Sequence, residues 1–335
     1  NRKDQVLSMK NKEAIQTGER FRRWFMQYAG QFAFLIILFV VLSIASPTFR
    51  TATNLINVAR QVSINMIIAC AMTLVLIIGG IDLSVGAVMA MSGMVSAYLS
   101  LMGIPFGICL LAGLGVGAVS GLIDGLILAN THLPAFIVTY AIQNILRGMV
   151  YVITGAGTIR LTSQAYMNFG GASLGPIPYP VIYMILIVII SSLLLSGSKF
   201  GRHMYAIGGN PKAALFAGID TKKITVLIYT ISGICAGMAG MVLTSRNSSM
   251  QPAVGNGAEM DAIAAVVLGG TSMAGGRGAI AGTVLGAFII GFINNGLNML
   301  KMDSFYQYIC KGIVILIAVY MDDYKNTKML KGSKK

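Results

Sequence analysis

Long apolar runs alternate with short polar segments along almost the whole of this chain. A helix needs about 20 apolar residues to cross the hydrocarbon core of a bilayer, and runs of this kind recur. The pattern predicts an all-α polytopic membrane protein with ten transmembrane helices. The predicted spans cover residues 29–46, 62–78, 85–101, 105–129, 133–152, 180–196, 224–244, 260–268, 279–300 and 306–321.

The eighth of these spans, 260–268, is too short to cross a bilayer by itself. It is followed by the glycine-rich segment Gly269–Gly278, whose residues permit a break in helix geometry. We therefore expect a broken or re-entrant segment at this point of the chain.

Composition supports the membrane assignment. Of the 335 residues, 56% are hydrophobic and 11% are charged, whereas soluble domains contain about 25% charged residues. The chain also contains 40 glycines, and small residues allow helices to approach closely in lipid.

The formal net charge of +14 comes mainly from basic residues in both terminal tails and in the loop after residue 196. Cytoplasmic segments of membrane proteins carry such an excess of Lys and Arg, so we place both termini in the cytoplasm. Arg147 and Lys311 fall within spans, and we expect them to extend toward the outer interface. Aromatic residues are not interleaved with the basic clusters, which argues against nucleic-acid binding.

This orientation divides the chain into a membrane domain and two tails. Residues 1–28 and 322–335 are predicted as basic cytoplasmic tails, and residues 29–321 as the transmembrane domain. Within that domain, residues 197–223 form a cytoplasmic loop. The long outer loops cover residues 154–178 and 245–259.

No residue pattern typical of a catalytic or metal site occurs in the sequence. The four cysteines stand singly in apolar stretches, without the spacing of metal ligands. Gly269–Gly278 lacks the Gly-Lys-Ser/Thr ending of a phosphate-binding loop, and that ending is absent elsewhere in the sequence. We therefore predict a non-catalytic chain that binds no metal and no cofactor of its own.

A short helix is predicted over Gly208–Ile219, in the basic loop. Asn210 suits the N-cap, Pro211 the first helical position and Gly218 a left-handed stop. So short a helix is marginally stable alone, and its apolar residues need a surface to pack against. That surface is either a partner protein or the membrane interface.

The segment Gly79–Gly86 interrupts two apolar runs. Its glycines permit a break in helix geometry, and Asp82 or Ser84 could cap the following helix. Two interpretations remain open: an element of a pathway or gate, and a tight turn on the inner side with a capping Asp.

Several uncharged polar residues fall within the predicted spans. Asn294 and Asn298 lie one helical turn apart and share a face. Amide and hydroxyl groups suit a pathway for a neutral polyol, but they also form hydrogen bonds between helices, worth about 0.6 kcal/mol each. The candidate pathway residues are Asn65, Asp82, Ser84, Gln143, Asn144, Asn294 and Asn298.

Four motifs together resemble one family. Gly79–Gly86, Ala206–Ile219, Glu259–Gly278 and Phe292–Leu297 are similar to the ribose-type sugar permeases of bacterial ABC importers, in the same order and with similar spacing. The resemblance implies a multi-pass subunit of the bacterial inner membrane that pairs with a second copy of itself. It also implies a cytoplasmic ATP-binding subunit, which would hold ATP and Mg²⁺, and an extracytoplasmic sugar-binding protein.

In that family the loop helix couples the permease to its ATPase. Gly208, Ala213, Ala214, Gly218 and Ile219 match the family pattern at this helix. The candidate coupling residues are Gly208, Asn210, Pro211, Ala213, Ala214, Leu215, Phe216, Gly218 and Ile219.

Other functions are compatible with parts of the sequence. The family also includes permeases for galactose, xylose, arabinose and autoinducer-2, although the motif Gly269–Gly276 favours ribose. An ion-coupled secondary transporter would hold an ionisable residue at mid-membrane, for which Asp124 is the best candidate. An ion channel would need a filter segment, and none is visible.

Overall fold

The computed structural model describes residues 26, 28–303, 305–307, 309–310, 312–314, 316–317 and 319–320. Both predicted tails, apart from residues 26 and 28, lie outside the described residues. The described part is predominantly helical, which confirms the all-α class.

Seven helices among the described residues are long and apolar enough to cross a membrane. They are the N-terminal helix Tyr28–Ala45, α2 (Ala52–Ile77), α4 (Phe106–Asn130), α5 (Ala135–Thr154), α7 (Tyr179–Gly197), α10 (Thr221–Arg246) and α12 (Ile280–Met299).

Two further predicted spans are shorter helices. α3 (Val85–Leu101) has 17 residues, and α11 (Ala258–Leu268) has 11. The length of α11 agrees with the expected short eighth span, since it is about half of what a crossing requires. The tenth predicted span, 306–321, is helical wherever it is described. The total of ten spans stays a prediction.

Short elements join these helices. They are η1 (Pro47–Arg50), β1 (Ile159–Arg160), α6 (Gln164–Gly171), β2 (Ser173–Leu174), β3 (Ile177–Pro178), α8 (Lys199–Gly209), α9 (Pro211–Phe216) and β4 (Ser249–Met250).

One predicted boundary is wrong by ten residues. The second span was expected to begin at residue 62, whereas α2 begins at Ala52. Its first turns contain polar side chains, which the hydropathy pattern assigns to a loop. These side chains have protein partners instead: Asn54 and Asn295 of α12 exchange two amide hydrogen bonds of 2.9 and 3.0 Å.

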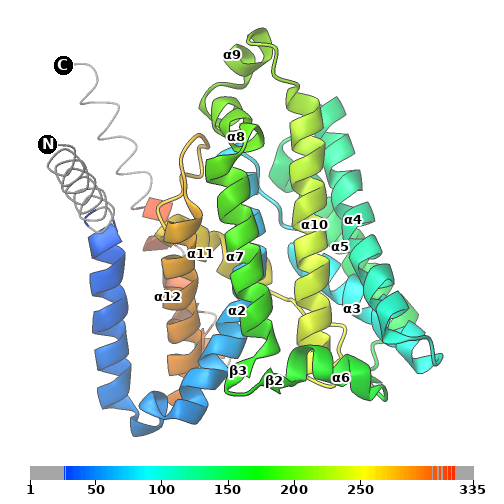
Figure 1. Ribbon diagram of the computed structural model, residues 1–335, viewed down its shortest axis with the longest axis vertical. Helices are drawn as coiled ribbons and strands as arrows, with labels where there is room; N and C mark the ends of the chain where they lie inside the picture. The colour runs from blue at the N-terminus through cyan, green and yellow to red at the C-terminus, as the bar shows by residue number, and fades with distance from the viewer. Residues whose placement is uncertain are drawn as a thin grey trace, which may run out of the picture.

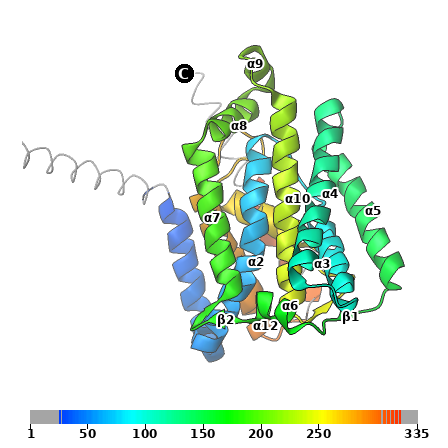
Figure 2. The same cartoon turned by 45° about the vertical axis from the view of Figure 1, so that its right-hand side comes forward.

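α2 occupies the centre of the described bundle (Figures 1 and 2). The helices that pack around it are α7, α10, α11 and α12. Within α2, every residue from Val62 to Ile77 except Asn65 is buried. The Asn54–Asn295 pair joins one end of α2 to α12, and the hydroxyls of Thr73 and Thr283, 2.6 Å apart, join them near the other end. The two helices therefore run antiparallel.

The bundle has two distinct ends. α8 and α9 form one end, and α6, β2 and β3 lie at the other (Figure 1). At this second end β1 pairs antiparallel with β4, which brings the loops 154–178 and 245–259 together. The 197–223 loop thus lies opposite to them, as predicted. That α8 and α9 face the cytoplasm is an expectation from the distribution of charge.

A row of glycines lets α4 and α10 approach closely. Gly113, Gly117, Gly121 and Gly125 recur every fourth residue and are buried on one face of α4. A Cβ atom at Gly121 would collide with the carbonyl oxygen of Tyr229 on α10. The hydrophobic effect does not drive helices together in lipid, so van der Waals contact between closely packed backbones provides the attraction instead.

This contact predicts opposite effects for the same substitution on two faces of α4. Gly121→Ala should destabilise the protein by about 1–3 kcal/mol, because the added methyl group forces the helices apart. Gly115→Ala is the matched control, since a Cβ there meets nothing within 4 Å. Its replacement should stabilise α4 by about 0.5–1 kcal/mol.

Thermal unfolding of the two variants in detergent measures both effects. Equal unfolding temperatures for the two variants would contradict the close contact between α4 and α10.

Candidate functional site

Three irregular segments adjoin the central helices: 78–84 after α2, 251–257 before α11, and 269–279 after α11. Each contains glycine in the left-handed region, for example Gly79 at φ +79° and Gly255 at φ +77°. The first segment interrupts the helix where the sequence predicted a break. Irregular backbone at membrane depth persists where protein or a watery cavity satisfies its polar groups.

A polar cavity of about 180 Å³ lies between α2, α12 and the start of α11. Amide side chains dominate its wall. Gln61 and Asn65 lie one turn apart on α2, and Asn294 and Asn298 lie one turn apart on α12. The other lining residues are Met89, Leu243, Gly255, Asn256, Ala258, Asp261 and Gln307.

The chemistry of this wall suits an uncharged polar solute. An amide both donates and accepts hydrogen bonds, as a hydroxyl does, and Asp261 adds acceptor oxygens. The Asn294 amide donates to Asp261 Oδ2 at 3.0 Å, so the two side chains hold each other in place.

The predicted pathway residues occupy three different places. Asn65, Asn294 and Asn298 line the cavity. Asp82 and Ser84 lie in the 78–84 segment, where both are buried and bonded to each other.

The last two candidates, Gln143 and Asn144, lie on α5 and are not among the residues that line the cavity. The Asn144 side chain is exposed and donates to the carbonyl of Tyr140 at 2.9 Å. Thr139, one turn before Gln143 on this helix, contacts the 78–84 segment: its hydroxyl accepts from Leu83 N at 3.1 Å.

The Arg147 side chain of α5 extends to the loop 245–259, which the sequence assigns to the outer side. Its Nη1 atom donates to the carbonyls of Pro252 and Val254, both at 2.7 Å, and the Glu259 carboxylate attracts its charge. The guanidinium thereby anchors the 251–257 segment, which forms one wall of the cavity. Lys311, the second expected case, lies outside the described residues.

At the opposite end, the predicted helix Gly208–Ile219 is divided between α8 and α9. Gly208 and Gly209 close α8, which the sequence analysis did not predict and which begins after its N-cap Ser198. The Ser198 hydroxyl accepts from Gly201 N at 3.0 Å.

The ends of α9 have the predicted capping residues. Asn210 Oδ1 accepts from Ala213 N at 3.0 Å, and Pro211 occupies the first helical position. Gly218 has φ +80° and Ile219 N donates back to the carbonyl of Ala214 at 3.1 Å, which closes the helix.

α9 projects from the end of the bundle (Figure 1). It carries apolar side chains that the rest of the described structure leaves uncovered. Ala214 faces inward and is 3% exposed, whereas Leu215 is 59% exposed and Phe216 is 90% exposed. An apolar pair at the tip of an otherwise polar loop is a surface suited to a partner.

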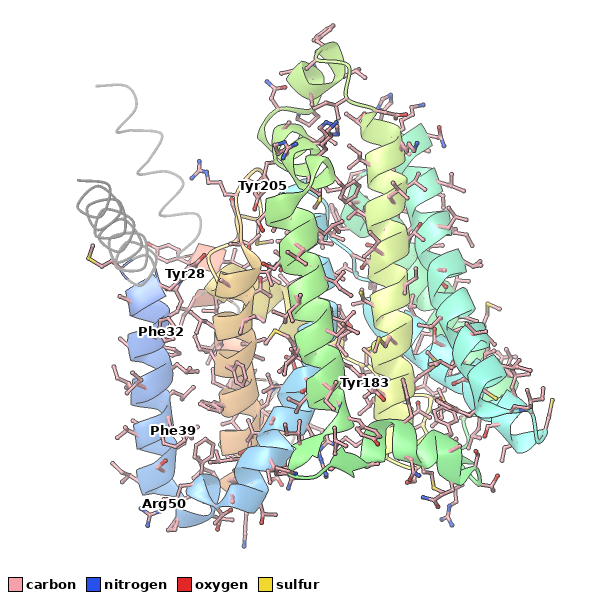
Figure 3. The ribbon with its side chains drawn as sticks, in the orientation of Figure 1. Tyr28, Phe32, Phe39, Arg50, Tyr183 and Tyr205 are labelled. Carbon is pink, nitrogen blue, oxygen red and sulfur yellow. The ribbon has the colours of Figure 1, made fainter. Side chains whose placement is uncertain are left out.

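α8 connects this tip to the irregular segments below it. Gly208 lies against Ile77 O and Gly276 N, with no room for a Cβ atom. Gly276 N itself donates to Ile77 O at 2.8 Å. The Tyr205 hydroxyl donates to Gly278 O at 2.7 Å, and Figure 3 shows Tyr205 on the α8 ribbon. We call this contact of α8 with residues 77–79 and 275–278 the glycine junction.

Sequence reasoning missed four polar residues of the cavity wall. A signal existed for Gln61, because its spacing from Asn65 repeats that of Asn294 and Asn298. A second signal existed for Asp261, an acidic residue within a largely apolar run. Asn256 and Gln307 carry no such signal, since their approach to the cavity depends on the path of the chain.

Comparison with known proteins gives a consistent result. Residues 54–319 match the protein family described as branched-chain amino acid transport system / permease component. The chain is 46% identical to the ribose import permease protein RbsC of Bacillus subtilis (strain 168) over 307 residues, which cover 90% of this chain and 94% of that protein.

Two further relatives come from Escherichia coli (strain K12). Its ribose import permease protein RbsC is 42% identical over 318 residues, covering 92% of this chain and 98% of the relative. Its D-allose transport system permease protein AlsC is 39% identical over 303 residues, covering 90% and 93%. No solved structure matches the chain.

The anchoring role of Arg147 predicts a local loosening of the cavity wall in Arg147→Met. Hydrogen bonds from a charged donor contribute about 1.5–3 kcal/mol each, so residues 251–257 should exchange their amide hydrogens faster. Arg160→Met, at an exposed position in the loop that pairs with β4, is the matched control. Hydrogen–deuterium exchange with unchanged protection of 251–257 in Arg147→Met would contradict the anchor.

Proposed function

This chain belongs to the permease family named above, and from that premise we propose that it is the membrane subunit of an ABC importer for ribose. Its relatives named as ribose permeases support this sugar, and the motifs noted in the sequence point the same way. The D-allose and arabinose permeases among its relatives make another monosaccharide the alternative.

The polar cavity supports a sugar as the transported solute. A monosaccharide is uncharged and presents hydroxyl groups on all sides, which paired amides can bind as donors and acceptors. We propose Asn65, Asn294 and Asn298 as pathway residues, together with Gln61 and Asp261. Weak, multiple contacts of this kind suit transport, because a tightly held solute would not leave.

The exposed tip of α9, which α8 joins to the glycine junction, is the observation that carries the proposal. We propose that the exposed side chains of Leu215 and Phe216 insert into the ATP-binding subunit when the importer assembles. Movement of α9 would pass through α8 to the ends of α2 and α11, because α8 contacts the segments that follow both helices. These contacts support a mechanical route from the partner to the helices that line the cavity.

The remaining parts of the importer belong to partners. We propose that the cytoplasmic subunit binds ATP and Mg²⁺, that a sugar-binding protein docks at the end formed by α6, β1 and β4, and that a second copy of this chain completes the pathway. The chain itself is a multi-pass protein of the bacterial inner membrane, in contact with lipid over its apolar outer helices.

Reconstitution into vesicles tests the function. By itself the chain should not concentrate ribose, because it has no means of using ATP. Addition of the ATP-binding subunit, the sugar-binding protein, ATP and Mg²⁺ should produce accumulation. Accumulation by the chain alone under a proton or sodium gradient would contradict the proposal and favour a secondary transporter.

The coupling contact predicts that Phe216→Ser weakens binding of the ATP-binding subunit. Burial of a Phe side chain contributes about 1.5–3 kcal/mol, so the affinity should fall roughly 10–100-fold. Because Phe216 is 90% exposed, the unfolding temperature of the chain alone should not change.

Lys212→Ser is the matched control, since Lys212 is exposed on the same short helix but contributes little apolar area. Affinity measured in detergent between the two purified subunits separates the outcomes. Equal affinity for Phe216→Ser and the unchanged chain would exclude the tip of α9 as the docking surface.

A further inference from the structure

Two carboxylic acids meet inside the bundle, away from the polar cavity. Asp82 lies in the 78–84 segment and Asp124 on α4, and they are 1% and 0% exposed. The Ser84 hydroxyl lies between them, 2.7 Å from Asp82 Oδ1 and 3.0 Å from Asp124 Oδ2. The proposed transport function assigns no role to Asp124.

Asp82 is surrounded by donors. Its Oδ1 accepts from the backbone N–H of Ser84 at 2.9 Å and from the Ser84 hydroxyl, and its Oδ2 accepts from the Ser232 hydroxyl at 2.6 Å. A carboxylate accepts hydrogen bonds at both oxygens, whereas a protonated acid has given one of these sites to its own proton. The three donors therefore identify Asp82 as the ionised member of the pair.

The contact of Ser84 with Asp124 requires a second proton. A serine hydroxyl carries one proton, and the shorter contact gives it to Asp82. An ionised Asp124 would then face a lone pair of the Ser84 oxygen at 3.0 Å. A proton on Asp124 Oδ2 makes that contact a hydrogen bond, with Asp124 as donor and Ser84 Oγ as acceptor.

The second oxygen of Asp124 fits the same state. Asp124 Oδ1 is buried and has no hydrogen-bond partner among the described residues. An unpaired carboxylate oxygen is far more costly to bury than the carbonyl oxygen of a neutral acid. The described Arg, Lys and His side chains include none that bonds to either carboxyl group.

We propose that Asp82 and Asp124 form a proton-binding site, in which one proton on Asp124 completes a chain of hydrogen bonds from Asp124 through Ser84 to Asp82 and Ser232. These hydrogen bonds hold the 78–84 segment against α4 and α10. The same segment begins in the glycine junction, where Gly79 lies against Gly275. The bound proton thus holds in place the backbone that links the junction to α3.

The site gives stability a definite dependence on pH. A free Asp carboxyl in the unfolded chain ionises near about pH 4, whereas the folded protein keeps the proton on Asp124 to a higher pH. Stability should therefore fall as the pH rises from about 4, until the folded protein also loses the proton and two negative charges stand on either side of one hydroxyl. Tyr229 of α10 is the other titratable side chain that acts electrostatically on both carboxyl groups. Its own titration has to be separated from that of Asp124.

Infrared spectroscopy of the full chain in detergent tests the proton directly. At neutral pH the spectrum should contain the carbonyl stretch of a buried protonated acid, and Asp124→Asn should remove this band. Asp220→Asn, at an exposed N-cap of α10, should retain it. Identical carboxylic-acid bands in the unchanged chain and in Asp124→Asn would overturn the proposal.

Thermal unfolding of the same proteins provides a second, independent test. An Asn at 124 can still donate to Ser84, so Asp124→Asn should unfold near the original temperature at about pH 5 and lose less stability than the unchanged chain between about pH 5 and about pH 9. Asp82→Asn replaces an acceptor oxygen by a donor and should unfold at a lower temperature at every pH. Tyr229→Phe should keep the loss of stability seen in the unchanged chain over this pH range. Equal destabilisation by Asp82→Asn and Asp124→Asn would contradict the asymmetry.

A bound cation is the competing occupant, and it predicts a different result. Replacing choline by sodium at constant ionic strength should leave the unfolding temperature unchanged if a proton occupies the site. A sodium-dependent rise that Asp124→Asn abolishes would overturn the proton site in favour of a cation site. Because these measurements use neither sugar nor ATP, their outcome is independent of the transport proposal.

Discussion

Backbone polar groups inside a membrane must find partners within the protein, and this constraint shapes the centre of the bundle. Three irregular segments, 78–84, 251–257 and 269–279, adjoin the helices at the centre of the bundle. Each is held by a side chain from a helix that is itself regular: Thr139 and Arg147 of α5, and Tyr205 of α8. The cavity and the glycine junction exist because these segments are supported.

The irregular segments contribute to two different parts of the molecule, the polar cavity and the glycine junction. The 251–257 segment and the amides of α2 and α12 line a polar cavity. At the α9 end, the segments that follow α2 and α11 meet beneath Gly208. If α2 and α11 ended in ordinary turns, the segments that follow them would not reach Gly208. The arrangement therefore joins an exposed apolar tip to the cavity wall through a few backbone contacts.

Glycine makes these contacts possible in two different ways. Along α4 it is a matter of distance, because only a residue without a Cβ lets the backbone of α10 come so near. In the junction it is also a matter of conformation, since Gly79 and Gly276 adopt positive φ angles of +79° and +71°. The glycines along α4 thus allow close approach of helices, and those in the glycine junction also allow positive φ angles.

Local sequence patterns were enough to predict the helical class, most helix boundaries, the break after α2 and the caps of α9, because these features follow from local hydropathy and from residues adjacent in the chain. They could not determine the early start of α2, whose polar residues are satisfied by Asn295 far along the chain. Only the tertiary structure brought Gln307 and Asn256 to the cavity, separated Gln143 from it, and gave Arg147 and Asp124 their partners. The physical reason is the same in each case: a polar side chain within a membrane span is costly until it has a partner, and a chain supplies that partner from a place that local pattern does not encode.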